Sequence, residues 1–119
     1  MQVITKDVNE MLLLNLNFGF QPILNKAPIP VNFSGYEFAL LLVATKNVLV
    51  DNVAERILLT SSAPNSVFQI QNNDGRVFIN FPMKMLHSNY YTARLYLQNS
   101  QLQLLMFEFQ LVKSGVSHV

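Results

Sequence analysis

Apolar and polar residues alternate over several stretches of this chain, and a period of two is typical of half-buried β-strands. The stretch from Met11 to Phe18 places four apolar side chains on one face and two asparagines on the other. Tyr90 to Leu97 alternates in the same way. Leu102 to Val112 is the longest such stretch, and it predicts an inward face made of Leu105, Phe107, Phe109 and Leu111.

The segment Asn72-Asn73-Asp74-Gly75 separates two further apolar runs, Val67 to Ile70 and Arg76 to Phe81. An Asp-Gly pair in that position predicts a β-hairpin, because the tight turn needs residues that tolerate positive φ. After the second run, Pro82 to His87 ends the strand, and we expect at most one helical turn there.

Three segments leave the type of element open. Tyr36 to Ala44 is apolar on both faces, which predicts a strand buried on both sides, with a buried helix as the alternative. Asn47 to Val50 and Glu55 to Thr60 are short strand candidates, although Val53 to Leu59 also contains good helix formers. Gln21 to Val31 carries three prolines and is expected to be an edge or a loop.

Near the N-terminus, Asp7 and Glu10 have the spacing of a capping box, which would begin a short helix. Elsewhere, short strands with turn signals about every 10 residues favour an all-β protein with about seven to nine short strands. We expect one domain over residues 1–119, with its main core between the last two strands and Phe38, Leu40 and Leu42. The period of two does not separate a sandwich from a barrel.

Composition adds one property to this description. Half of the residues are hydrophobic and only 13% are charged, against about 25% charged in typical globular domains. Surplus apolar surface favours a subunit interface, so a homo-oligomer or a contact with other proteins is expected. The net charge of +1 argues against non-specific binding of nucleic acid, which needs a basic stripe.

Targeting signals are not expected from the pattern. The start of the chain is too polar for a signal peptide, and the longest apolar run, Phe38 to Ala44, is far shorter than the roughly 20 residues of a membrane helix. We therefore expect a soluble protein made in the cytoplasm, with no membrane partner. The chain has no cysteine, so neither a disulfide framework nor a thiolate metal site is expected.

Residues for catalysis do not form a recognisable constellation. His87 and His118 lack nearby ligands for a metal. Each acidic residue has a structural explanation in a turn, a cap or the polar side of a strand, and no phosphate-binding glycine loop or nucleophile elbow is present. We expect no enzymatic activity, no cofactor and no small-molecule substrate.

Five residues are candidates for a contact surface. Tyr90, Arg94 and Tyr96 share one face of a predicted strand, and tyrosine and arginine are enriched at protein interfaces. The same face could stack single-stranded bases, but the lysines are scattered along the chain, which favours a protein partner. Met83 and Met85, on either side of Lys84, would add an adaptable apolar contact.

Several segments resemble small virion modules of tailed phages. Asn32-Phe33-Ser34-Gly35-Tyr36-Glu37-Phe38 is similar to their turn into a strand, and Phe68 through Ile79 is similar to the hairpin that follows. Tyr91 to Leu97 and Phe107 to Val112 resemble their closing strands, except that Glu108 stands where those modules carry glycine. The proline-rich Gln21 to Val31 has no counterpart in them.

This resemblance implies an immunoglobulin-like antiparallel β-sandwich, of the kind found in structural proteins of tails and baseplates, including the N-terminal domains of upper baseplate proteins. Such modules work by surface contacts and carry no catalytic residues. The function expected is therefore a phage or prophage virion component of a tail, baseplate or head that assembles with copies of itself or with other virion proteins. The alternatives are a small β-barrel that binds an apolar ligand and a phage-encoded inhibitor of a host protein.

Overall fold

The computed structural model describes residues 2–18, 20–21, 29–30, 33, 35–45, 49–50, 53–64, 66–71 and 75–115. These residues are almost entirely β-structure, as expected. The long strands are β1 (Gln2–Asp7), β2 (Met11–Asn17), β5 (Glu37–Ala44), β8 (Arg56–Thr60), β9 (Phe68–Gln71), β10 (Arg76–Pro82), β11 (Tyr90–Gln98) and β12 (Gln103–Ser114). The strand alternative is therefore confirmed for both β5 and β8.

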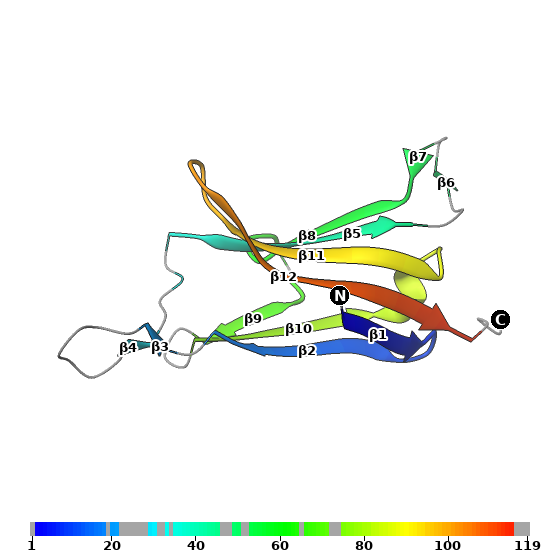
Figure 1. Cartoon of the computed structure of the whole chain (residues 1–119), viewed down its shortest axis with the longest axis horizontal. Helices are drawn as coiled ribbons and strands as arrows, with labels where there is room; N and C mark the ends of the chain where they lie inside the picture. The colour runs from blue at the N-terminus through cyan, green and yellow to red at the C-terminus, as the bar shows by residue number, and fades with distance from the viewer. Residues whose placement is uncertain are drawn as a thin grey trace.

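The strands form two layers (Figure 1). One sheet has the order β1-β12-β11-β5-β8, and the other has the order β2-β10-β9. All neighbours are antiparallel except β1 and β12, which run parallel. Within the part of the chain that the structure describes, the two large sheets do not pair with each other, so the fold is a sandwich rather than a closed barrel.

The order of the strands is that of an immunoglobulin-like sandwich of the variable type. With the letters B, C, C′, D, E, F and G given in turn to β2, β5, β8, β9, β10, β11 and β12, the small sheet is B-E-D and the large sheet contains C′-C-F-G. Strand β1 extends the large sheet beyond G. The fold expected from the sequence is thus confirmed.

The short elements complete the predicted pattern. Phe20–Gln21 (β3) pairs with Ile29–Pro30 (β4), and Leu49–Val50 (β6) pairs with Val53–Ala54 (β7). The remaining parts of the proline-rich segment and of the 47–52 segment lie outside the described residues. Met83–Met85 forms a 3-10 turn (η1), the single helical turn that was expected after β10.

The predicted hairpin joins β9 to β10. Gly75 has φ of +66°, in the left-handed region that glycine adopts at low cost. Its carbonyl oxygen accepts a hydrogen bond of 2.8 Å from the amide of Phe18 at the end of β2. One glycine therefore turns the hairpin and ties it to the third strand of its sheet. Residues 72–74 of the turn lie outside the described residues.

The core fills the space between the two sheets. Phe38, Leu40 and Leu42 of β5 pack with the inward residues of β11 and β12, as expected, and with Leu12 and Phe81 from the other sheet. At one end, Phe38 lies 5.0 Å from Phe33 and 6.3 Å from Phe68 between ring centroids. Aromatic pairs of this geometry contribute beyond their area burial, and this cluster joins the two layers at the start of β5.

Tyr91 secures the other end of the sandwich. Its hydroxyl oxygen accepts a hydrogen bond of 2.8 Å from the amide of Ser88, and its O–H donates to the buried carboxyl of Glu55. The amide of His87 donates to the second oxygen of that carboxyl at 3.3 Å. Burial, with the Glu55 contact second, raises the pKa of Tyr91 well above its ordinary value, so the phenol stays a donor.

A tyrosine at the start of strand F that bonds to the preceding backbone is characteristic of immunoglobulin-like sandwiches. Two residues further on, antibody domains carry a disulfide cysteine. Ala93 occupies that position here and is completely buried in the core. Apolar packing replaces the covalent link between the sheets.

Four sequence expectations need correction. One hydrogen bond of the predicted capping box is present, since the amide of Asp7 donates to the Glu10 side chain at 2.9 Å, but the Asp7 side chain accepts from the amide of Asn9 at 2.9 Å rather than from that of Glu10. These bonds close the turn between β1 and β2, however, rather than beginning a helix. The same side chain–backbone bonds that cap a helix also stabilise a turn, and the pairing of β1 with β12 selects the turn.

The second correction concerns Leu105. The register between β11 and β12 shifts between Leu95 and Tyr96, so that Leu95 faces Phe107 while Tyr96 faces Leu105. This β-bulge inserts one residue, Met106, and reverses the side on which the preceding residues point. Leu105 therefore lies on the outer face beside Tyr96, whereas Phe109 and Leu111 are buried as expected.

The third correction concerns β5, which was expected to be buried on both sides. Its inward residues are buried, but Leu41 and Val43 on the opposite side are only half-buried. Within the described residues, no further layer covers that side of the sheet. The fourth correction, the burial of Met83, is described with the contact surface below.

Replacing Tyr91 with phenylalanine removes only the hydroxyl group. We expect Tyr91→Phe to lower the free energy of unfolding by about 1–3 kcal/mol, because the buried Glu55 carboxyl loses one of its two donors and the amide of Ser88 loses its acceptor. Urea unfolding measures the change. The control is Tyr36→Phe at an exposed tyrosine, where we expect a change within about 0.5 kcal/mol; equal effects of the two substitutions would contradict this role.

Candidate contact surface

The outer face of the five-stranded sheet is formed by the residues that point away from the core. Strand register places Leu58, Leu41, Arg94 and Glu108 in one row across β8, β5, β11 and β12. The next row is Thr60, Ala39, Tyr96 and Leu105, and the row on the other side is Arg56, Val43, Thr92, Gln110 and Val3. Tyr90 and Val112 pair at the end of the sheet.

Large apolar side chains are exposed across this outer face. Leu58 is 61% exposed, Val3 is 54% exposed and Leu105 is 52% exposed. They come from β8, β1 and β12, so they extend over the full width of the sheet. Single exposed apolar residues need no explanation, whereas several on one face of a sheet favour an interaction site.

A single ion pair lies in the central row. The Nε atom of Arg94 is 2.7 Å from an Oε atom of Glu108, and the two residues are directly opposite in the antiparallel register. The hydrogen bond and charge of Glu108 raise the pKa of Arg94. An exposed pair of this kind adds little to stability, but it neutralises both charges at the centre of the outer face.

The structure brings together three of the five residues predicted for a contact surface. Tyr90, Arg94 and Tyr96 all lie on the outer face of β11. Met85 is exposed but belongs to η1 rather than to the sheet. Met83 is fully buried in the core, so its proposed contact role is wrong: the 3-10 turn directs it inward, where its flexible side chain packs beside Phe81 and Leu86.

Sequence reasoning missed the other apolar residues of the outer face. Leu58 was placed in a short strand without a role, and Leu105 was assigned to the core. Leu41 and Val43 did carry a signal, because β5 is apolar on both sides. That pattern was interpreted as burial within the fold, whereas the described fold covers only one side.

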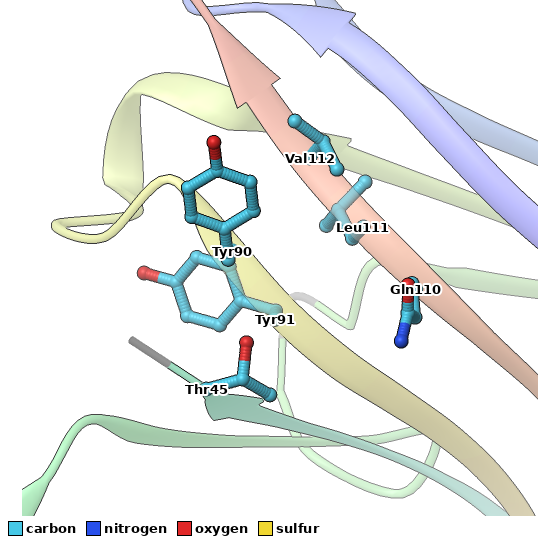
Figure 2. Close-up of a pocket in the computed structure, with 6 residues that line it drawn as sticks. All are labelled: Thr45, Tyr90, Tyr91, Gln110, Leu111 and Val112. Carbon is cyan, nitrogen blue, oxygen red and sulfur yellow. The ribbon is translucent and has the colours of Figure 1, made fainter. Parts of the chain in front are cut away.

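A shallow pocket of about 240 Å³ opens at the Tyr90 end of the sheet (Figure 2). Thr45 lines one side and Gln110, Leu111 and Val112 of β12 line the other, with Tyr90 and Tyr91 between them. Pockets that hold cofactors or drug-sized ligands span about 300–1,000 Å³. The hollow at the Tyr90 end is smaller than that range.

The turn end of the β11–β12 hairpin is held by a chain of polar contacts. Gln103 donates to Gln98 at 3.0 Å, and Gln98 donates to Glu37 at 2.9 Å. The hydroxyl of Ser62 donates to the other oxygen of Glu37. These hydrogen bonds, that of Ser62 first, lower the pKa of Glu37. They connect the hairpin to the start of β5.

Among the residues that the structure describes, no group of three or more histidine, cysteine, aspartate or glutamate side chains is close enough to hold a metal ion. None of the described helical residues forms a segment long and apolar enough to cross a membrane. His87 is exposed, as expected, and His118 lies outside the described residues.

Comparisons with protein-family models, with curated proteins and with solved structures found no match to this chain.

The contacts of Glu37 predict a dependence of stability on acid. Its pKa in the folded chain lies below the ordinary value of 4.5, so its contribution is complete above that pH and is lost as pH falls through the lowered pKa. We expect the melting temperature of Glu37→Gln to fall less steeply than that of the natural chain between about pH 5 and pH 2. The matched control is Glu10→Gln in the β1–β2 turn, and parallel curves for the two variants would contradict the assignment.

Proposed function

We propose that this chain is a non-enzymatic interaction module that works by burying the outer face of its five-stranded sheet against another copy of itself. The observation that carries this proposal is the two-sided apolar character of β5. The fold uses Phe38, Leu40 and Leu42 for the core and leaves Leu41 and Val43 half-buried outside. A partner surface accounts for the second set.

The size of the sheet suits such an interface. Five strands about 4.8 Å apart and a strand length of eight residues, that of β5, at about 3.3 Å each give roughly 600 Å² before side-chain relief is added. Stable interfaces bury about 800 Å² on each partner. The outer face thus approaches the area that a stable dimer needs.

The central charges favour a two-fold arrangement. A two-fold axis that passes between Arg94 and Glu108 places each of them over the opposite charge of the second copy, and such an interface is self-complementary. Charge at the centre then remains paired when water is excluded, which limits the desolvation cost. Tyr90 and Tyr96 lie on the same strand and supply the aromatic contacts that interfaces favour.

The setting that we propose for this module is a phage or prophage virion, in a tail, a baseplate or a head. It is supported by the resemblance of the strand and turn segments to small virion modules. An immunoglobulin-like sandwich is the fold that this resemblance implies, and surface contact is the way such modules work. A barrel with an apolar ligand has less support, because the side chains of the two layers fill the described interior.

Substitutions on the outer face test the self-association. We expect the natural chain to form dimers, and we expect Leu58→Glu and Tyr90→Ala each to weaken dimerisation at least about tenfold, the equivalent of one lost interface contact. Light scattering coupled to size exclusion over a wide concentration range measures this. The control is Ala63→Glu in the exposed turn after β8, which should dimerise normally.

A natural chain that stays monomeric at every concentration would contradict self-association through the outer face. The face would then serve a different protein, such as another virion component or a host enzyme. Capture of that partner should still depend on Leu58 and Tyr90.

A further inference from the structure

We propose that the tip of the β11–β12 hairpin is a second and separate contact element, which inserts into an apolar groove on the three-stranded sheet of another copy. The hairpin tip is defined as residues 98–105, the turn and the strand ends on either side of it. The groove lies between β2, β10 and β9, on the side of that sheet that faces away from the core. Leu105 is the one residue shared by the hairpin tip and the outer face proposed above, and the groove shares none with that face.

Three leucines are exposed around the hairpin tip. Leu102 is 43% exposed and Leu104 is 44% exposed, and both are close to the turn, where polar residues are usual. Leu104 is opposite Leu97 on the inward side of the hairpin, whereas Leu105 is opposite Tyr96 on the outward side. Leucines on both sides of a hairpin cannot be covered by a flat surface, so the tip suits a concave partner.

The hairpin tip is ordered before it binds. The side-chain oxygen of Asn99 accepts hydrogen bonds from the amides of Gln101 at 2.8 Å and Leu102 at 2.9 Å. The amide of Asn99 donates to the carbonyl of Leu102 at 2.9 Å. Together with the Gln103–Gln98–Glu37 contacts at its base, these bonds reduce the ordering cost that association would otherwise carry.

The groove on the three-stranded sheet has a volume of about 340 Å³. Leu13, which is 62% exposed, and Phe78 supply its apolar side chains. Asn15, Gln69 and Asn80 stand around them, because the register places Phe78 between Asn15 and Gln69 and places Leu13 beside Asn80. An apolar centre with a rim of amides is the composition of a small protein-binding groove.

The two surfaces match in charge. None of residues 98–105 is charged, and neither is any residue that lines the groove. Insertion of the tip would therefore leave no charge without water or a partner, which is the main penalty for burying polar surface. Glutamine and asparagine side chains occur on both sides and can bond to each other. A second copy of this chain is thus a suitable occupant of the groove.

The geometry makes this contact a head-to-tail one. In Figure 1 the hairpin tip, in orange, rises away from β2, β10 and β9, so the tip is directed away from the groove of its own molecule. Joining two different surfaces gives rings or open filaments rather than closed two-fold dimers. The tip and groove are also smaller than a standard interface of about 1,600 Å² in total, so we expect association that rises with concentration.

Complementary variants test the pairing. The tip variant carries Leu102→Asp and Leu104→Asp, and the groove variant carries Leu13→Asp; all three are exposed positions. Both variants also carry Leu58→Glu, which weakens association through the outer face to the same extent in every sample. By sedimentation velocity, we expect each variant alone to associate at least about tenfold more weakly than the Leu58→Glu chain. An equal mixture of the two variants should form one-to-one pairs, because the intact tip of the groove variant fits the intact groove of the tip variant.

Two matched controls keep the result specific. Met11→Asp changes an exposed residue of β2 on the same side as Leu13 but outside the groove, and Ala63→Asp changes an exposed residue of the turn after β8, outside both the hairpin tip and the groove. Each control also carries Leu58→Glu, and each should associate as strongly as the chain with Leu58→Glu alone. Thermal melts followed by circular dichroism establish that every variant is folded.

Two results would overturn the proposal. One is a mixture that sediments no faster than its separate components. The other is a Leu58→Glu chain that stays monomeric at concentrations up to about 1 mM, which would place any dissociation constant above about 1 mM. Because Leu58→Glu weakens the outer face equally in every sample, either result bears on the tip and the groove, and the two-fold dimer proposed for the outer face is judged by its own variants.

Discussion

The alternation of side chains along a β-strand is the constraint on which the rest of this structure depends. Each strand must present every second residue to one side, and a two-layer sandwich buries only one side of each sheet. Strand β5 is apolar at both sets of positions. Burying Phe38, Leu40 and Leu42 in the core therefore forces Leu41 and Val43 outward, to a side of the sheet that no other described layer covers.

The core does not rely on any covalent link. Phe33, Phe38 and Phe68 hold one end of the two layers together. At the other end Tyr91 reaches from β11 to the backbone of Ser88 and to the carboxyl of Glu55, which precedes β8. These two groups of contacts hold the two ends of the large sheet, and contacts that order a surface before it binds lower the entropy cost of association.

The β-bulge in the last hairpin links the two proposed contact surfaces. One additional residue, Met106, moves Leu105 from the inward row to the outer face beside Tyr96. Beyond the bulge, Leu102 and Leu104 are at the end of a hairpin that the core no longer covers. The same irregularity thus enlarges the outer face of the sheet and separates the leucine tip from it. Bulges commonly redirect side chains at sites of contact in this way.

The sequence alone was sufficient to predict the elements that depend on residues only a few positions apart. The alternation in β2 and β11, the Asp74-Gly75 turn and the break after Pro82 each depend on neighbours a few residues apart, and all of them predicted the observed elements. The contact role of Tyr90, Arg94 and Tyr96 could be suggested for the same reason, since residues two apart in a strand share a face.

Only the tertiary structure decided the features that depend on distant pairing. The parallel alignment of β1 with β12, the closure into two sheets rather than a barrel, and the inward position of Met83 each join residues from different parts of the chain. The bulge at Leu95 and Tyr96 is set by the register between two strands, and it reverses the side on which Leu105 lies. A pattern of period two records which residues alternate, but the side that each set faces is chosen by the strands and layers packed against it.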